Sequence, residues 1–185
     1  MDRKEVGIRM GMRAGAVVAA LAGATLLAGG ARIARAAGNP KNATATIEAR
    51  SGSRVTGTAT FEEMRDHVQV TVEIAGAAPG EHGVHIHEKG DCTAPDASSA
   101  GPHFNPGGAS HGAPNASSHH SGDFGNLTVG ADGKGKLTLM THDITLKAGP
   151  RSARGRAIVI HEKPDDLKSQ PAGNAGARIG CGVIR

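Results

Sequence analysis

The sequence predicts an all-β protein, an antiparallel β-sandwich or barrel with two long functional loops. Three observations support this. Apolar and polar residues alternate with a period of two in several stretches, turn-rich connections separate these stretches, and helical periodicity is nearly absent. The chain has no Trp or Tyr and only three Phe, so its core must be built mainly from Val, Ile, Leu and Ala.

The strands of the N-terminal half vary in clarity. Weak alternation fits strands over 43–50 and 53–61. The clearest strand covers 68–74, where Val and Ile at every second position alternate with Gln, Thr and Glu, so that one face is buried and the other is wet. A further weak strand fits 83–88.

The C-terminal half adds a hairpin and two more strands. Strands around 127–129 and 137–139 flank the turn Asp132-Gly133, which is typical of a hairpin. A weaker strand fits 155–161, and an alternating stretch near the C-terminus contains Ile179, Cys181 and Val183.

Two segments interrupt the alternation and form the predicted long loops. Residues 89–125 are rich in Gly, Pro, Ser, Asn and His, and residues 162–178 are polar with several Pro and Gly. An irregular segment of over thirty residues inside a compact domain is uncommon and is usually functional. We therefore expect the functional residues to gather in these loops.

Residues 1–36 have the features of a secretory signal peptide. A basic region precedes an apolar run from Ala14 to Ala31, and Ala34-Arg35-Ala36 matches a cleavage site. The alternative is a membrane anchor, but the run is rich in Gly and Ala and ends in the cleavage pattern. We predict an exported protein, periplasmic or extracellular, without stable membrane insertion after cleavage. Residues 37–42 would be a flexible leader and 43–185 the folded domain.

Removal of the signal changes the charge balance. The whole chain has 21 Lys and Arg against 17 Asp and Glu, and residues 1–36 contain six of the basic and two of the acidic residues. The remainder has 15 of each, so its net charge is zero with neutral His. The basic character belongs to the signal and predicts no nucleic-acid partner.

The two cysteines, Cys92 and Cys181, both lie in the exported part. An even number of cysteines in an oxidising compartment favours a disulfide. The alternative is a pair of thiolate metal ligands, but the two residues do not form a C-x-x-C motif.

Six histidines and one aspartate have a spacing that suggests metal ligation: His85, His87, His103, His111, His120, Asp123 and His161. Nitrogen-rich sites suit copper and zinc, and the single carboxylate fits zinc better. Seven ligands exceed the need of one tetrahedral ion, so the simplest count is two metals that share a ligand. This predicts redox chemistry at copper with zinc beside it.

Local spacing supports two ligand groups. His85 and His87 share one face of a strand, and His161 ends another. The other four residues lie in the long loop 89–125, where His120 and Asp123 are close enough to chelate one ion. His119 competes with His120 on spacing alone, and solvated surface histidines are the alternative for all of them.

Five segments occur in one order along the chain. They are His85-Ile86-His87-Glu88, Gly101-Pro102-His103-Phe104-Asn105-Pro106, His120-Ser121-Gly122-Asp123-Phe124-Gly125-Asn126, His161-Glu162-Lys163-Pro164-Asp165-Asp166 and the glycine-rich run from Gly173 to Ile184. This order resembles the copper/zinc superoxide dismutase family, and the resemblance covers about residues 43–185. The short loop 167–173 and the signal peptide make the chain similar to the exported bacterial branch of that family.

The resemblance implies a Greek-key β-sandwich or barrel of immunoglobulin-like architecture that contains copper and zinc. The implied copper ligands are His85, His87, His103 and His161. The implied zinc ligands are His103, His111, His120 and Asp123, with His103 bridging the two metals. The resemblance also selects His120 over His119 and implies a disulfide between Cys92 and Cys181.

Roles are also expected for three further residues. Asp165 matches a carboxylate that links His85 to His111, with Asp166 as the alternative, and Arg178 matches an arginine beside the open copper position. His82 is expected to be structural rather than a ligand.

The implied activity is dismutation of superoxide by alternate reduction and oxidation of copper, with His103 supplying a proton and Arg178 attracting the anion. The alternative is a copper- or zinc-binding or storage protein with little turnover on the same scaffold. Superoxide is the expected substrate, and a homodimer is possible.

Overall fold

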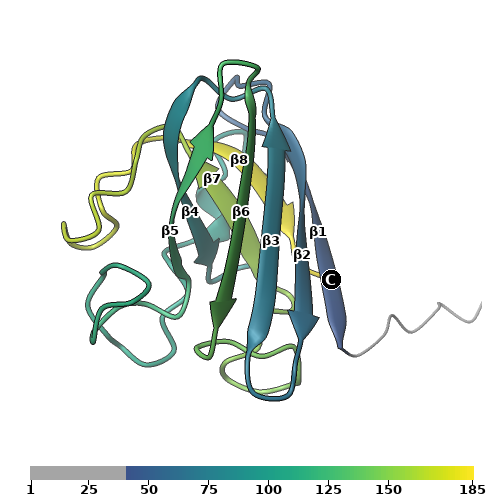
Figure 1. Ribbon diagram of the computed structural model, residues 1–185, viewed down its shortest axis with the longest axis vertical. Coiled ribbons are helices and arrows are strands. Elements are labelled where there is room, and N and C mark those ends of the chain that lie inside the picture. Colours follow the sequence, from purple (N-terminus) through teal and green to yellow (C-terminus); the bar gives the residue numbers. More distant parts are fainter. Residues whose placement is uncertain (1–40) are drawn as a thin grey trace, which may run out of the picture. The chain divides into compact units, whose positions relative to one another are not determined.

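The computed structural model describes residues 41–185, which form one closed barrel of eight antiparallel strands (Figure 1). The interpreted signal peptide and residues 37–40 of the leader lie outside the described residues. Around the barrel the strands follow the order β1-β2-β3-β6-β5-β4-β7-β8. They are β1 (Asn42–Ala49), β2 (Thr56–Glu63), β3 (Val68–Ala75), β4 (Gly80–His87), β5 (Asp123–Val129), β6 (Lys134–Thr141), β7 (Ala157–His161) and β8 (Arg178–Val183).

The order confirms the predicted antiparallel Greek-key fold. β4 follows β3 in the chain but lies beyond β6 and β5 in the barrel, so the β3–β4 connection crosses the end of that hairpin. β3 pairs with β6 over its whole length, from Val68 opposite Thr141 to Ala75 opposite Lys134. The predicted strand 68–74 is therefore correct. The Asp132-Gly133 hairpin is correct as well, since residues 130–133 join β5 to β6, which pair at Val129 and Gly135.

The barrel interior is the hydrophobic core, and it is filled by the alternating residues that the sequence pattern identifies. Val68, Val70, Val72 and Ile74 of β3 are all buried, and the intervening residues face outward. Phe61 of β2 also lies in this core and is fully buried. Predicted strand 53–61 begins earlier than β2, because Ser53 instead donates from its Oγ to Ile179 O and accepts from Val55 N.

Strand β4 is buried on both faces, unlike a strand with one wet face. Val84 and Ile86 pack inside the barrel core. His85 and His87 point to the opposite side, where they are also buried. The outer face of this part of the barrel must therefore be covered by other segments of the chain.

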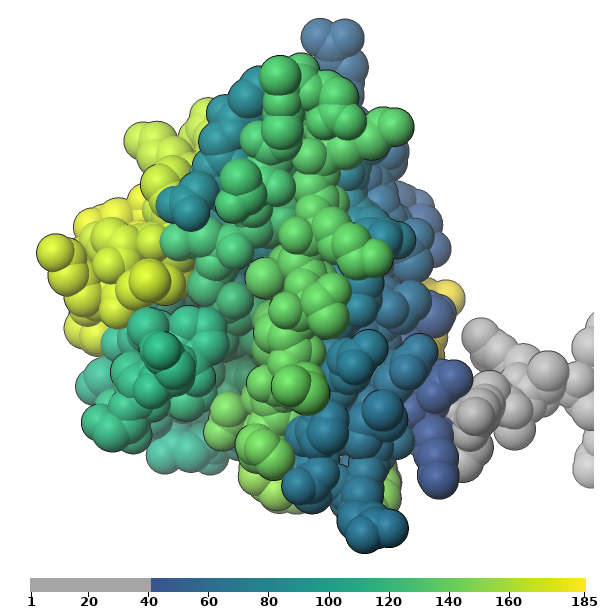
Figure 2. Space-filling model, viewed as in Figure 1, coloured from purple at the N-terminus to yellow at the C-terminus, as the bar shows by residue number. Residues whose placement is uncertain are grey.

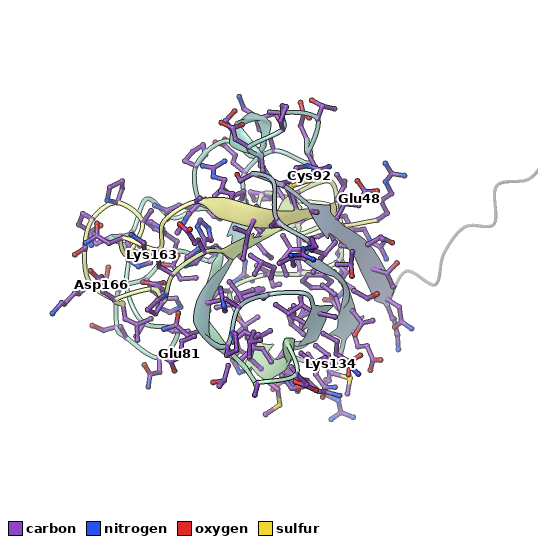
Figure 3. The ribbon with its side chains drawn as sticks, turned by 90° about the horizontal axis from the view of Figure 1, so that it is seen from above. Glu48, Glu81, Cys92, Lys134, Lys163 and Asp166 are labelled. Atoms are coloured by element: carbon purple, nitrogen blue, oxygen red, sulfur yellow. A yellow bond between two sulfur atoms is a disulfide. The ribbon has the colours of Figure 1, made fainter. Side chains whose placement is uncertain are left out.

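Two loops provide this cover, and they project from the same side of the barrel (Figure 1). The first loop, residues 88–122, connects β4 to β5 and contains the short 3₁₀ helix η1 (Ser98–Ala100). The second loop, residues 162–177, connects β7 to β8. Figure 3 labels Lys163 and Asp166 on the second loop, whose start is held against β4 because Gly83 N donates to Lys163 O at 2.9 Å.

A disulfide fastens the first loop to the barrel. Cys92 of the loop is bonded to Cys181 of β8, which confirms the pairing. Both half-cystines are buried in a second small apolar cluster with Ala157 and Val159 on the outer side of β7. Within residues 41–185, no helix is long and apolar enough to cross a membrane.

Candidate metal centre

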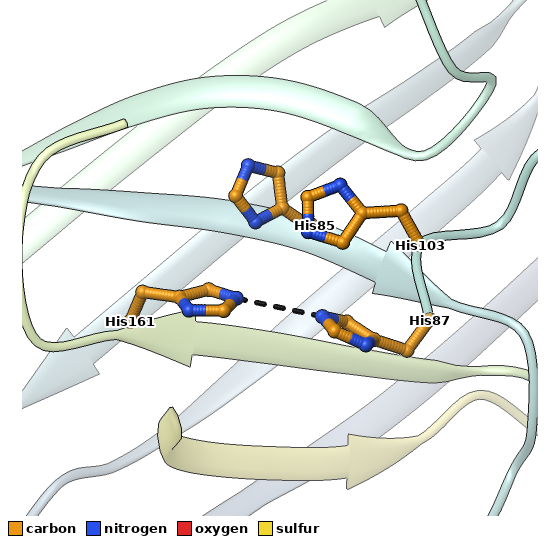
Figure 4. A group of neighbouring side chains, drawn as sticks. All are labelled: His85, His87, His103 and His161. Carbon is orange, nitrogen blue, oxygen red and sulfur yellow. Dashed lines mark hydrogen bonds between the residues drawn. The ribbon is translucent and has the colours of Figure 1, made fainter. Parts of the chain in front are cut away.

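Seven side chains from four elements converge beneath the two loops. The imidazoles of His85, His87, His103 and His161 form one buried group whose nearest ligand atoms all lie within 4.8 Å of one another (Figure 4). His103, His111, His120 and Asp123 form a second group by the same measure, also fully buried. His103 belongs to both groups, so the structure brings together every residue of the two predicted ligand sets.

Strand geometry positions the first group. His85 and His87 share the outer face of β4 because they are two residues apart. β7 pairs antiparallel with β4 and ends at His161, where a register shift follows Ile160. The first loop returns to the end of β4, where His103 pairs with His87 in an isolated bridge and Phe104 N donates to Ile86 O at 2.8 Å.

Hydrogen bonds to one nitrogen of each ring direct the other nitrogen inward. His87 Nδ1 donates to Gly101 O at 2.8 Å, and His161 Nδ1 lies 3.4 Å from Gly176 O. The remaining nitrogens of these two rings, both Nε2, are 3.4 Å apart (Figure 4). His85 Nε2 is bonded to Asp165 Oδ2 at 2.8 Å, which leaves His85 Nδ1 on the same side. Such contacts fix the ring orientation and tautomer of metal-binding histidines.

The second group surrounds the carboxylate of Asp123. His103 Nδ1 and His111 Nδ1 lie 2.9 Å from Oδ1 and 3.0 Å from Oδ2 of this carboxylate, and His120 Nδ1 lies 3.3 Å from Oδ1. Three imidazole nitrogens and one carboxylate are the donor set of a closed tetrahedral zinc site. His103 presents its Nδ1 to this group and its Nε2 to the first one.

Four of these buried nitrogens have no hydrogen-bond partner among the described residues: His85 Nδ1, His103 Nε2, His111 Nδ1 and His120 Nδ1. The contacts of His111 and His120 with Asp123 are close, but they lack hydrogen-bond alignment. A buried polar atom without a partner costs about 1–3 kcal/mol, so four such atoms in one place require an explanation. A metal ion in each group would satisfy all four, and the residues therefore fit copper and zinc.

The electrostatics of the centre favour the forms that bind metal. Burial, reinforced by the neighbouring His103, lowers the pKa of His85 and His87 well below the usual histidine range. Burial likewise lowers the pKa of His161 to about 3. Burial opposes ionisation of Asp123, but hydrogen bonds from His103 and His120 N outweigh it and lower the pKa of Asp123 to about 2. Neutral imidazole and ionised carboxylate are the ligating species.

Asp165 is hydrogen-bonded to one histidine of each group. Its Oδ2 accepts from His85 Nε2 at 2.8 Å, and its Oδ1 accepts from His111 Nε2 at 2.9 Å. Asp166, the alternative, is instead exposed and accepts hydrogen bonds from Lys168 N and Ser169 N in its own loop. Asp165 is fully buried and so holds one imidazole of each group in a fixed orientation.

Two neighbours hold Asp165 in place. Asn126 of β5 accepts from Asp165 N at 2.7 Å and donates to Asp165 O at 2.9 Å. Gly173 packs so closely that a Cβ at its position would overlap Asp165 Oδ1. Sequence reasoning missed both roles, although Asn126 ends the segment that carries His120 and Asp123.

The second loop also contacts the first directly. Gln170 bonds both main-chain groups of His111. The surfaces of the two loops lie side by side in Figure 2. Sequence reasoning gave Gln170 no role, since a single glutamine in a polar loop carries no pattern.

Arg178 borders a pocket of about 400 Å³ that reaches the first group. His87, His103 and His161 line this pocket, together with part of the second loop. The guanidinium of Arg178 donates to Ala97 O and Gly101 O, each at 2.8 Å. Burial lowers the pKa of Arg178 somewhat, opposed by Asp96, but a guanidinium stays charged. The two carbonyls flank η1, and no sequence signal indicated them.

Two other histidines lie outside both groups. His82 is buried and contacts His161 O at 2.7 Å and Ala78 O at 2.9 Å, as expected of a structural residue. His119 contacts Ala116 O and the carboxylate of Asp143, so it faces away from Asp123.

Comparisons with known proteins agree with this geometry. Residues 55–184 match the family model described as copper/zinc superoxide dismutase (SODC). Among solved structures, the chain is similar to the crystal structure of the clock protein EA4. The two sequences are 39% identical, the match covers 78% of this chain and 94% of that one, and the TM-score is 0.71.

Proposed function

This chain belongs to the copper/zinc superoxide dismutase family, and from that premise we propose that it converts superoxide to oxygen and hydrogen peroxide. Two superoxide anions and two protons are consumed. One superoxide loses an electron and becomes oxygen, and the other gains that electron and two protons and becomes hydrogen peroxide. The observation that carries the proposal is the intact pair of donor groups joined by His103.

The donor atoms that converge within each group are the proposed ligands. Copper would be held by His85 Nδ1 and by the Nε2 atoms of His87, His103 and His161. Zinc would be held by the Nδ1 atoms of His103, His111 and His120 and by Asp123. When bound, copper supplies a one-electron redox couple and zinc a fixed positive charge.

Arg178 is the proposed anion-binding residue. Its two bonds to main-chain carbonyls hold the guanidinium at the pocket wall, on the same side as His87, His103 and His161. A fixed cation there attracts superoxide and can donate a hydrogen bond to it. Since the mature chain would have no net charge, this local field is the proposed source of attraction.

His103 is the proposed proton carrier. Its Nε2 is buried and faces the first group, and its Nδ1 faces Asp123. Held in place from the Nδ1 side, the ring can accept a proton at Nε2 and return it to the departing peroxide without reorienting. Retention of full activity at all pH values after substitution of His103 would exclude this role.

We also propose that the protein is exported. The signal-like residues 1–36 support this, and so does the Cys92–Cys181 disulfide, since disulfides persist in oxidising compartments.

A copper- and zinc-binding protein with little turnover is the second candidate. The similarity to a protein described by a clock role favours considering it. The presence of Arg178 beside the pocket supports the enzyme, because a storage site needs no anion-binding cation.

The deciding experiment is the rate of superoxide decay catalysed by the protein loaded with copper and zinc. The zinc-only protein and an equal amount of free copper are the controls. A copper-dependent rate far above that of free copper supports the dismutase. A rate equal to that of free copper, with both metals bound, would contradict it and leave the binding protein.

A further inference from the structure

A cluster of His and Met side chains lies on the outer wall of the barrel, away from the metal centre. His67 immediately precedes β3, and His142 immediately follows β6. Because β3 and β6 pair with Val68 opposite Thr141, the next pair in the same register is His67 opposite His142. Val68 and Thr141 face inward and are buried, so both histidines face outward.

The β2–β3 turn extends this row to a third strand. Met64 N donates to His67 O at 2.8 Å, one step beyond the pair of Glu63 and Val68. Met64 therefore lies beside His67 on the outer face. In Figure 1 this turn and the end of β6 lie next to each other at the lower end of the barrel.

A second methionine completes the group. Met140 of β6 is two residues before His142 and so shares its outer face. Met64 and Met140 are 46% and 68% exposed, and they are the exposed large hydrophobic residues of the described chain. They are also its only methionines. Their thioether sulfurs are therefore available to a ligand at the surface and do not serve to fill the core.

The two imidazoles are already oriented as metal ligands are. His67 Nδ1 donates to the carboxylate of Asp66 at 2.9 Å, and His142 Nδ1 donates to the main-chain oxygen of Asp66 at 2.8 Å. Each ring thus uses Nδ1 internally and leaves Nε2 as an acceptor, the arrangement that carboxylates and carbonyls impose on metal-binding histidines. Among the described residues no hydrogen bond reaches either Nε2.

The spacing of the rings also fits a shared ion. Their centroids are 5.8 Å apart. Within the metal centre, His87 and His161 are 5.6 Å apart, and His103 and His120 are 5.5 Å apart. The outer pair therefore has nearly the same ring separation as pairs within the two candidate donor groups.

We propose that Met64, His67, Met140 and His142 form an accessory copper(I) site on the outer face of β2, β3 and β6. Thioether sulfur and imidazole nitrogen together select copper(I) over zinc and the harder divalent ions. Asp66 is the positioning residue for both imidazoles, and its carboxylate also supplies negative charge beside the cation. In Figure 2 the β2–β3 turn and the end of β6 adjoin on the open surface of the molecule, so the site is accessible to a copper donor.

The test is anaerobic copper(I) titration of the intact protein whose copper/zinc centre has first been filled, with bound copper counted after equilibrium dialysis. We expect one further copper(I) per chain, accompanied by shifts of the Met64 and Met140 methyl resonances in NMR spectra. The double variant H67N/H142N should lose this extra ion. K136Q, on the outer face of β6 but four residues before Met140, is the matched control and should retain it.

Two more variants test the chemistry. M64L/M140L should weaken the extra copper(I) by tenfold or more while zinc(II) binding to the histidine pair stays unchanged. D66N should weaken copper(I) by roughly 10–100-fold, as removal of a carboxylate behind a ligand histidine does. Absence of a further ion in the unaltered protein, its persistence in H67N/H142N, or no effect of M64L/M140L would each overturn the proposal.

This site does not depend on the dismutase proposal. All these variants should keep the superoxide decay rate of the unaltered protein, because none of the four residues touches the metal centre. Failure of the accessory site would leave that rate unaffected, and a protein without dismutase activity could still bind the extra copper(I).

Discussion

Gln170 forms hydrogen bonds with both main-chain groups of His111: its Oε1 accepts from His111 N and its Nε2 donates to His111 O, each at 2.9 Å. The two loops that cover the metal centre are thus joined by a pair of hydrogen bonds, like a residue pair in neighbouring strands. No part of this link needs a metal, so it can prepare the position of His111 before zinc binds.

We therefore expect Q170A to weaken zinc binding. Loss of two partly buried hydrogen bonds costs about 1–3 kcal/mol, which corresponds to roughly a 5- to 150-fold rise in the zinc dissociation constant. Competition with a zinc chelator measures it. Q69A, on the outer face of β3, is the control and should bind zinc normally. Equal zinc affinity in Q170A and the unaltered protein would show that the link is dispensable.

Asp165 should affect both metals. D165A removes the acceptor of His85 Nε2 and of His111 Nε2, so both rings lose their fixed orientation. We expect each metal to bind roughly 10–100-fold more weakly. The neighbouring D166A, which changes only hydrogen bonds within the exposed loop, should leave both affinities close to normal. Metal content after dialysis against a chelator series distinguishes the two.

Arg178 should affect rate and leave metal binding unchanged. R178Q removes the cation and should reduce the second-order rate constant roughly tenfold or more, and the remaining rate should depend less on salt. R178K keeps the charge but cannot reach both Ala97 O and Gly101 O with a planar fork, so we expect an intermediate rate. An R178Q rate equal to that of the unaltered protein would remove Arg178 from the mechanism.

Glu63 should make stability depend on acid pH. Its side chain is largely buried; burial opposes ionisation, but hydrogen bonds from Leu146 N and Thr145 Oγ1 outweigh it and lower the pKa of Glu63 below 4.5. The folded protein thus holds this proton less tightly than the unfolded chain. The stabilisation is complete above pH 4.5 and is lost as the pH falls through the lowered value.

E63Q should accordingly lower the free energy of unfolding by about 1–3 kcal/mol at pH 7. The difference from the unaltered protein should shrink as the pH is lowered below 4.5. Urea unfolding of the metal-free proteins measures it without interference from metal release, and the outward-facing E62Q serves as control. A difference that stays constant with pH would contradict the assigned cause.

The elements that sequence reasoning located well are those with a local periodic signal. The alternation at 68–74 identified β3, and Asp132-Gly133 identified the β5–β6 hairpin, because side-chain direction in a strand follows directly from position. The seven candidate donor residues could also be singled out, since His and Asp are chemically distinctive, and the structure brings them together in two groups. The start of β2 was placed too early, because Ser53 bonds to Ile179 across a distance that no local pattern encodes.

The supporting residues were harder to find for the same reason. Asn126 and Gly173 contact Asp165, 39 and 8 residues away, and Gln170 contacts His111, 59 residues away. Arg178 is anchored by main-chain oxygens, which every residue has. Such contacts are created by the fold and have no sequence signature of their own.

The two buried faces of β4 contribute to two different parts of the molecule. Val84 and Ile86 belong to the barrel core, and His85 and His87 belong to the metal centre. A shift of one residue in this strand would place imidazoles in the core and aliphatic side chains in the centre. Metal binding therefore requires the correct register of β4, and a chain that folds with a shifted register would contain no bound metal.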